Sequence, residues 1–386
     1  MSPRAISSRP KRIVALFTDL LGVGGVQQAG RVTGMALAEI ARERGWTVEF
    51  LSLNDARGMH DLPDASGVGL RGFARNKAGF GLAALRLAVG AGDDGVAVVG
   101  HPNLAPVAAW MRRLRAGLRV VVMSHGIEVW KPLAAHRRKA LQRADRVLAP
   151  SSFTEQRLIE VQRVAAEKVR RLPWPIRPTF LELASERQKR PLPAGFPHGR
   201  TVLTVGRWAA NERYKGGDVL IRAVAGLREA IQDIQLVAVG SGDDLPRLRA
   251  LAAELKVEDR VHFLEKLSDG EVAARYAHAD LFALPSTGEG FGLVFLEAMA
   301  FGKPVVGVAA GGVTDIVRDN ENGFLVPPGD AQRLSHALRM LLEDDALRAR
   351  LGAAGAEMVK REYSFEAFRA RLAEILSDCE NAAGRA

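Results

Sequence analysis

The sequence predicts an α/β protein of two Rossmann-like lobes, each a doubly wound parallel sheet, facing each other across a cleft. Three observations support this class. Short apolar, β-branched runs alternate with helical patterns in the first half, a proline-rich stretch follows, and the same alternation then starts again. Strands that alternate with helices are typical of a parallel sheet covered on both faces. At 386 residues the chain is long enough for two such domains.

The first lobe is expected over residues 1–172. Its first strand is "RIVALFT" at 12–18, followed by a glycine loop and the helical stretch "QQAGRVTGMALAEIARERG". The strands expected after it are "TVEFLSL", "VAVVG", "LRVVVMSH" and "RVLAPS". A loop or helix follows each of them, which is the order that a parallel sheet requires.

An interdomain linker is expected over residues 173–199, because six of the eighteen prolines lie between Pro173 and Pro197. The second lobe is then expected over 200–362. Its strands are "TVLTVGR", "IQLVAVG", "RVHFLEK", "LFALPS" and "PVVGV". The segment 363–386 reads as an amphipathic helix.

Composition indicates a soluble globular protein in a reducing compartment. Apolar residues make up 47% of the chain, no run of eighteen apolar residues occurs, and Cys379 is the single cysteine. The N-terminal "MSPRAISSRPKR" contains no apolar core of a secretory signal. We therefore expect a cytoplasmic location.

Positive charge is concentrated in the first lobe. Residues 1–180 hold 28 Lys and Arg against 14 Asp and Glu, whereas the whole chain has a net charge of +10. The densest stretch is "WMRRLRAGLR", which reads as a basic amphipathic helix carrying Arg112, Arg113, Arg115 and Arg119. Such a helix suits an anionic membrane surface, and a plain solvated face is the alternative. No motif supports a nucleic-acid partner.

Two motifs in the first lobe follow strand ends. In "FTDLLGVGGVQQAG", Gly24 and Gly25 precede a helix, where backbone N–H groups can hold a phosphate. A glycine turn that serves packing alone is the alternative. In "VMSHGIEVW", His125 directly follows an apolar strand and could bind a reacting sugar or phosphate, or be structural.

Two motifs in the second lobe also follow strand ends. "VGRWAANERYKGGD" places Arg207 and Lys215 in the first loop, where two cations suit a diphosphate and a surface pair is the alternative. "ALPSTGEGFGLVFLEAMAFGKPVVGV" holds Glu289 and, eight residues later, Glu297. We expect its glycines to expose the N–H groups of Phe291, Gly292 and Leu293 at a helix start. Glu297 would lie about two turns further on, where a carboxylate can accept hydrogen bonds from sugar hydroxyls.

These four motifs together resemble the retaining glycosyltransferases of family 4, which have the GT-B fold. The resemblance covers nearly the whole chain, with Glu289 and Glu297 as the family's E-x7-E pair. It implies that Glu297 binds the nucleotide ribose and that Glu289, with the backbone of 291–293, contacts the donor sugar and diphosphate. Arg207 and Lys215 would bind the diphosphate. Gly25, beside Gly24, would approach its distal phosphate, and His125 would lie near the transferred sugar.

The resemblance also implies that the last helix crosses back onto the first lobe and that no metal is required. Same-face attack, with the departing phosphate taking the acceptor's proton, would need no protein nucleophile. The expected co-substrate is a GDP- or UDP-linked hexose, and the expected acceptor is a glycan or a lipid-linked molecule. An anionic acceptor would suit the basic first lobe, and a peripheral position on the inner face of the plasma membrane is the accompanying hypothesis.

Two other functions remain open from the sequence. A sugar-nucleotide epimerase can have the same fold, although the E-x7-E arrangement belongs to the transferases. A sugar-nucleotide-binding protein without catalysis would not need all of the charged motif residues. Base, sugar and acceptor identity do not follow from these motifs.

Overall fold

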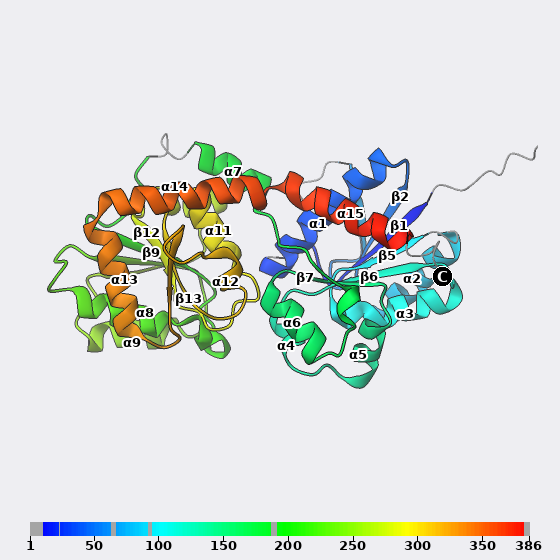
Figure 1. The fold of residues 1–386 in the computed structure, drawn as a ribbon, viewed down its shortest axis with the longest axis horizontal. Coiled ribbons are helices and arrows are strands. Elements are labelled where there is room, and N and C mark those ends of the chain that lie inside the picture. Colours follow the sequence, from blue (N-terminus) through cyan, green and yellow to red (C-terminus); the bar gives the residue numbers. More distant parts are fainter. Residues whose placement is uncertain (1–10, 23, 63–66, 92–94, 187–190, 382–386) are drawn as a thin grey trace, which may run out of the picture. The chain divides into compact units, whose positions relative to one another are not determined.

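The computed structural model describes residues 11–22, 24–62, 67–91, 95–186 and 191–381, so the N-terminal stretch without a signal motif lies largely outside it. The chain divides into two compact units (Figure 1). Unit 1 consists of Met1–Pro175 and Phe365–Ala386, and unit 2 is Ile176–Ser364. Each contains one sheet, so the prediction of two doubly wound α/β lobes is confirmed. The cleft expected between the lobes stays a prediction.

Unit 1 contains an eight-stranded sheet in the order β3-β4-β2-β1-β5-β6-β7-β8, parallel except for the antiparallel edge pair β3–β4. Its strands are β1 Arg12–Phe17, β2 Thr47–Ser52, β3 Gly58–Asp61, β4 Gly69–Gly72, β5 Val96–Val99, β6 Arg119–Met123, β7 Arg146–Ala149 and β8 Val169–Arg171. Its α-helices are α1 Gly25–Glu43, α2 Lys77–Gly90, α3 Ala105–Leu114, α4 Ile127–Trp130, α5 Ala135–Gln142, α6 Ser152–Glu160 and α15 Phe365–Asn381. Short 3₁₀ turns occupy Pro102–Leu104 and Ala166–Lys168.

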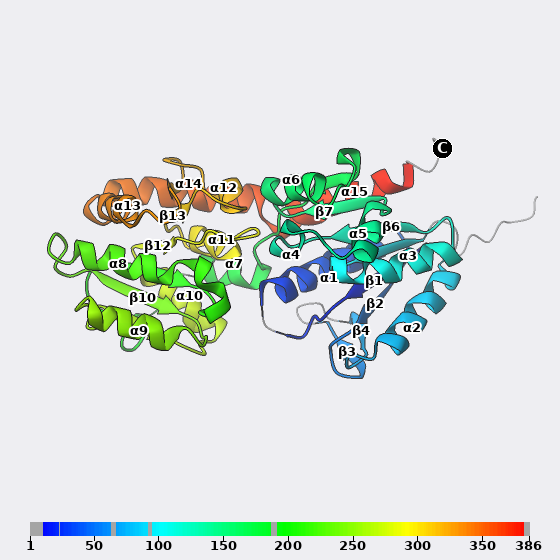
Figure 2. The same ribbon diagram turned by 90° about the horizontal axis from the view of Figure 1, so that it is seen from below.

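The core of unit 1 lies between this sheet and helices α2, α3 and α5. Val14, Val99 and Val122 of the strands pack in one buried cluster with Phe80 of α2 and Met111 of α3. Helices α2 and α3 contact each other on this side of the sheet and lie side by side in Figure 2. The continuous apolar strands therefore form because helices cover both faces of a parallel sheet.

Helix α15 belongs to unit 1, where it packs against α1. Arg369 contacts Glu39 at 3.4 Å and also pairs with Glu43, and Arg44 donates to the carbonyl oxygen of Ala373 at 2.8 Å. Phe368 of α15 lies 6.0 Å, centroid to centroid, from Trp174. The last segment of the chain therefore completes the first domain.

Unit 2 contains a six-stranded sheet of parallel neighbours in the order β11-β10-β9-β12-β13-β14. Its strands are β9 Thr201–Val205, β10 Gln235–Val239, β11 Val261–Leu264, β12 Leu281–Leu284, β13 Val305–Val308 and β14 Gly323–Val326. Its α-helices are α7 Pro178–Ser185, α8 Gly217–Leu227, α9 Leu245–Glu254, α10 Asp269–His278, α11 Leu293–Ala300, α12 Val313–Ile316, α13 Ala331–Glu343 and α14 Asp345–Glu362, and a 3₁₀ turn spans Ala210–Lys215. Helices α8, α9 and α13 pack together on one face, and α7, α11 and α14 lie on the other (Figure 1).

Three expectations differ from this fold. The range 173–199 is not simply a linker, because α7 lies within it and packs against α10 and α11 of unit 2. The basic stretch is not one helix: α3 ends at Leu114, and Arg119 begins β6. Strands β3, β4, β8 and β14 lack a long apolar run and were not expected from the sequence.

Candidate active site

The strand order of unit 2 reverses between β9 and β12, and a ligand is expected to bind there. Chain connections run outward from β9 in one direction and from β12 in the other, and ligands of such sheets bind beyond the carboxyl ends of the strands at this reversal. The loop after β9 carries Arg207 and Lys215, and the loop after β12 carries Glu289. The two second-lobe motifs are therefore neighbours in space.

A short ion pair joins these two loops. Lys215 Nζ donates to Glu289 Oε1 at 2.8 Å, and each side chain is only 15% exposed. Burial lowers the pKa of Lys215, but the charge and hydrogen bond of Glu289 raise it more, so the net shift is upward. Lys215 is therefore held as a cation between the loops that follow β9 and β12.

Backbone contacts fix the same two loops against each other. Gly216 has a left-handed backbone with φ of 72°, and a Cβ there would lie 2.5 Å from the carbonyl oxygen of Pro285. Thr287 N donates to the carbonyl oxygen of Tyr214 at 2.9 Å. Glycine at 216 is thus required by both φ and close approach, and it lets Lys215 reach Glu289.

Arg207 has a different environment from Lys215. Its side chain is 72% exposed, and its guanidinium pairs with Glu212, whose hydrogen bond raises the pKa of Arg207. Tyr214 lies in the electrostatic field of both cations: burial raises the pKa of its phenol, Lys215 and Arg207 lower it, and the net shift is upward. The two cations thus belong to one cluster, but their ion-pair partners differ.

The start of α11 presents backbone donors beside Glu289. Gly292 has φ of 106°, and α11 begins at Leu293. No hydrogen bond within the described residues uses the N–H groups of Phe291, Gly292 and Leu293. Donors in this arrangement at a helix start can bind an anion.

The loop of residues 289–292 is braced by the segment before α12. Gly312 N donates to the carbonyl oxygen of Glu289 at 2.8 Å. A Cβ at Gly312 would lie 2.4 Å from the carbonyl oxygen of Gly290. Phe291 is 4% exposed and packs with Tyr363, their ring centroids 6.0 Å apart. The loop geometry is therefore imposed by packing on its far side.

Glu297 lies one turn into α11, closer to the helix start than the two turns expected, because the helix begins only at Leu293. The residue is 8% exposed, and Tyr276 Oη donates to its Oε2 at 3.1 Å. Burial and then Glu297 raise the pKa of Tyr276 well above the usual range, so its phenol stays a donor. Tyr276, on α10, was missed by the sequence, where nothing distinguishes it from a core aromatic residue.

In unit 1 the glycine loop follows β1, next to the reversal of strand order between β1 and β5. Gly24 caps α1 with φ of 147°, and both Gly24 and Gly25 are exposed. Asp55 holds this loop by accepting from Leu20 N at 2.7 Å and Leu21 N at 3.2 Å. The helix start that carries Gly25 therefore faces solvent, and Asp55 fixes the loop that leads to it.

His125 lies beyond the carboxyl end of β6, between two other rings. The ring centroids of His101 and Trp174 lie 5.7 Å and 5.3 Å from that of His125. His125 Nε2 lies 2.7 Å from the carbonyl oxygen of Gly100, which can only accept, so Nε2 carries the proton. Nδ1 is then a buried acceptor, and it has no partner within the described residues.

His101 was also missed by the sequence. Its Nδ1 accepts from Asn103 N at 3.1 Å. Burial and then the neighbouring His125 lower the pKa of His101 to about 4; Glu128 opposes this shift, and Arg137 adds to it. His101 is therefore a neutral ring at neutral pH and can stack on His125 without adding charge.

The four arginines of the basic stretch do not form one face. Arg112 and Arg119 both pair with Asp145, at 2.9 Å and 3.5 Å. Arg113 lies over the ring of Trp110 at 5.9 Å, and Arg115 follows the end of α3. Arg112 and Arg119 are thus partly neutralised, contrary to the basic face expected for them.

The described residues show neither a metal-binding cluster nor a membrane-spanning helix. They contain no group of three or more His, Cys, Asp or Glu side chains placed to hold a metal ion. No helix among them combines the length and apolar character needed to cross a membrane.

Comparison with known proteins identifies the class. Residues 30–180 match the model described as Glycosyltransferase Family 4, and residues 191–358 match Glycosyl transferases group 1. Sucrose-phosphate synthase from Thermosynechococcus elongatus superposes with a TM-score of 0.74 at 26% identity, over 96% of this chain and 100% of that one. An Anabaena protein crystallised with UDP superposes with a TM-score of 0.73 at 20% identity, over 95% and 100% of the two chains. The fold is that of the GT-B glycosyltransferases.

Two curated relatives are named as mannosyltransferases. The GDP-mannose-dependent alpha-(1-6)-phosphatidylinositol monomannoside mannosyltransferase of Mycolicibacterium smegmatis is 31% identical over 74% of this chain and 78% of its own length. The phosphatidyl-myo-inositol mannosyltransferase of Mycobacterium leprae is 44% identical, and that match spans 44% of each chain. The protein belongs to glycosyltransferase family 4.

Proposed function

We propose that this protein is a retaining hexosyltransferase that moves a sugar from a nucleoside diphosphate sugar to a glycan or lipid-linked acceptor. The observation that carries the proposal is the buried Lys215–Glu289 pair, which lies beside three unused backbone N–H groups. A cation and helix-start amides are what a departing diphosphate requires. A relative named for GDP-mannose and a fold neighbour crystallised with UDP support a nucleotide-linked donor.

In this proposal the unit 2 residues hold the donor. Lys215 and the amides of residues 291–293 neutralise the diphosphate, and exposed Arg207 reaches it from the solvent side. Glu297, oriented by Tyr276, accepts hydrogen bonds from the ribose hydroxyls. When the sugar binds, Glu289 contacts its hydroxyls. Lys215 then interacts with the phosphate as well as with Glu289.

The transfer step needs no protein nucleophile. The acceptor hydroxyl attacks the anomeric carbon from the face that the diphosphate leaves, a new C–O bond forms, and the bond to the phosphate oxygen breaks. The acceptor's proton passes to that phosphate oxygen, so the products are the glycoside and a nucleoside diphosphate. In unit 1, His125 Nδ1 accepts a hydrogen bond from a hydroxyl of the transferred sugar, and its stacked neighbours hold the ring in place.

An anionic, membrane-associated acceptor is part of the proposal. The excess of positive charge in residues 1–180 supports it, as do relatives whose names specify phosphatidylinositol. We accordingly propose a cytoplasmic enzyme at the inner face of the plasma membrane, acting in polysaccharide or glycolipid synthesis.

The first experiment identifies the donor. Thermal unfolding is measured with GDP, UDP and ADP. A ligand at a hundred times its dissociation constant adds about 2.7 kcal/mol to the free energy of unfolding. Sugars linked to the stabilising nucleotide are then incubated with and without phosphatidylinositol or other lipid acceptors. Product that requires both substrates supports the transferase. An epimerised donor in the absence of acceptor would instead support a sugar-nucleotide epimerase.

Two measurements on the same reaction test its mechanism. The anomeric configuration of the product, determined by NMR, should match that of the donor. Turnover should persist in EDTA, since fixed cations and amides supply the neutralising charge. An inverted product would overturn retention, and activity that disappears in EDTA and returns with magnesium would overturn metal independence.

A further inference from the structure

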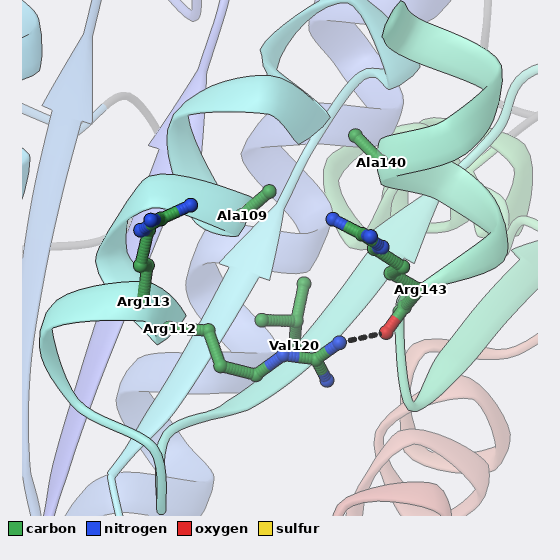
Figure 3. A pocket seen from close by; sticks show the side chains of 7 residues that line it. Ala109, Arg112, Arg113, Val120, Ala140 and Arg143 are labelled. Atoms are coloured by element: carbon green, nitrogen blue, oxygen red, sulfur yellow. Dashed lines mark hydrogen bonds between the residues drawn. The ribbon is translucent and has the colours of Figure 1, made fainter.

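A second basic site lies in unit 1, between helices α3 and α5. A cavity of about 340 Å³ is lined by Ala109, Arg112, Arg113, Val120, Ala140, Arg143 and Ala144. Figure 3 shows Arg113 and Arg143 on opposite sides of this cavity, with Arg112 between them. Among the described residues that line it, three are arginines and none is acidic.

This cavity is separate from the candidate active site. Val120 lies at the amino end of β6, whereas His125 follows the carboxyl end of the same strand. Five extended residues span about 16 Å. The cavity thus lies at the edge of the sheet opposite the strand ends that carry the glycine loop and His125.

The three arginines differ in what they contact. Arg112 bonds to Asp145 at 2.9 Å and also donates to the carbonyl oxygen of Arg143, so it neutralises the C-terminal end of α5 (Figure 3). Within the described residues, no hydrogen bond or ion pair engages the guanidinium of Arg113 or of Arg143, and both residues are exposed. Helix-end neutralisation accounts for Arg112 but leaves two cations facing the cavity.

The surroundings indicate what these cations bind. Two guanidinium groups across a cavity with alanine walls match a phosphate ester, which each can grip with two parallel hydrogen bonds. Trp110 and Leu114 are 62% and 56% exposed on α3, one helical turn apart, beside Arg113. An exposed aromatic and an aliphatic side chain next to arginines are suited to the interface of a bilayer.

We propose that this cavity, between Arg113 and Arg143, binds the phosphate of a lipid head group. Trp110 and Leu114 enter the interfacial region while the two guanidinium groups hold the phosphate. Arg112 keeps the cavity open by joining α3 to the end of α5. The site would dock unit 1 on an anionic leaflet, independently of the donor reaction.

Vesicle sedimentation of the full chain tests this proposal. Vesicles of phosphatidylcholine alone are compared with vesicles that also contain phosphatidic acid. The variants are Arg113→Gln, Arg143→Gln and Ala109→Phe, the last of which fills the cavity and keeps every charge. Arg163→Gln is the matched control, because Arg163 is an exposed cation of unit 1 outside the cavity.

We expect wild-type protein to partition preferentially onto the anionic vesicles. Each arginine variant should lower the partition constant at least about tenfold, as should Ala109→Phe, whereas the control should change it less than about threefold. Equal effects of Arg163→Gln and Arg143→Gln on the partition constant would show that vesicles attract the whole positive surface. That result, or an unchanged partition constant for Ala109→Phe, would overturn the proposal that the cavity binds lipid.

A soluble arm separates lipid from free phosphate. Isothermal titration with glycerol 3-phosphate and inorganic phosphate is run on the same variants, and circular dichroism checks that each is folded. If glycerol 3-phosphate binds and requires both arginines, but the protein does not bind vesicles, the ligand is a soluble phosphate ester. That result would overturn the proposal of a lipid head group. Absence of binding in both arms would overturn the site. The proposal predicts much tighter association with vesicles than with either soluble phosphate.

Discussion

Lys215 Nζ lies 2.8 Å from Glu289 Oε1, and this contact joins two loops that are 74 residues apart in the chain. Each partner is largely buried, so removing one leaves the other as a poorly solvated charge. The pair therefore holds both loops in one geometry and keeps a cation beside the amides at the start of α11.

Replacing Lys215 tests this relationship most directly. Lys215→Gln should lower kcat/KM for sugar transfer by at least about a hundredfold, because a neutralising group at the leaving diphosphate is lost. Lys256→Gln, which removes an exposed cation of unit 2, should leave kcat/KM nearly unchanged. Equal activity of the Lys215 variant and wild type would exclude a role in stabilising the leaving group.

Glu297 is predicted to recognise the ribose. Wild-type protein should bind its nucleoside diphosphate more tightly than the 2′,3′-dideoxy analogue, and Glu297→Gln should reduce that preference about tenfold. Tyr276→Phe should reduce it less, since it removes one hydrogen bond that orients the carboxylate. Isothermal titration gives both constants. An unchanged ribose preference in Glu297→Gln would place the ribose elsewhere.

The brace behind the donor loop can be tested with one methyl group. Gly312→Ala should weaken nucleotide binding, because the new Cβ would lie 2.4 Å from the carbonyl oxygen of Gly290 and displace the loop. Gly270→Ala is the control, since a Cβ added there would meet nothing within 4 Å and its φ is not positive. Dissociation constants are compared at matched temperature, with thermal unfolding as the folding check. Equal constants for the two variants would contradict the brace.

His101 predicts a specific pH dependence of stability. Its pKa falls from the ordinary value of 6.5 to about 4 in the folded protein, through burial and then through His125. The unfolded chain therefore binds the proton more readily than the folded protein does. The contribution of the neutral His101 ring to the free energy of unfolding is complete above pH 6.5 and is lost as the pH falls toward 4. The loss at this site approaches about 3 kcal/mol.

Urea unfolding from pH 7 to pH 4 measures this effect by comparison with His101→Phe, which keeps an aromatic ring and removes the titrating group. The free energy of unfolding of wild type relative to the variant should decline as the pH is lowered. A difference that stays constant over this range would show that His101 does not titrate as expected.

Local sequence patterns were enough to predict much of the fold. The apolar run at 12–18 predicted β1, and a buried parallel strand must be apolar along its whole length. Strand β4, which lies between β3 and β2, does not follow from the sequence pattern because its "GLRG" is short and only half buried. The prolines around helix α7 favour a linker in the sequence, although Pro178 stands at the first position of the helix, where proline is favourable.

The sequence by itself determined where the strands end and which charged residues and glycines follow them, because periodicity and turn residues are local properties of the chain. Only the tertiary structure decided that Lys215 meets Glu289, that Tyr276 donates to Glu297, and that His101 stacks on His125. These partners lie on different elements, and their pairing depends on strand order and loop packing. No pattern of neighbouring residues encodes such distant contacts.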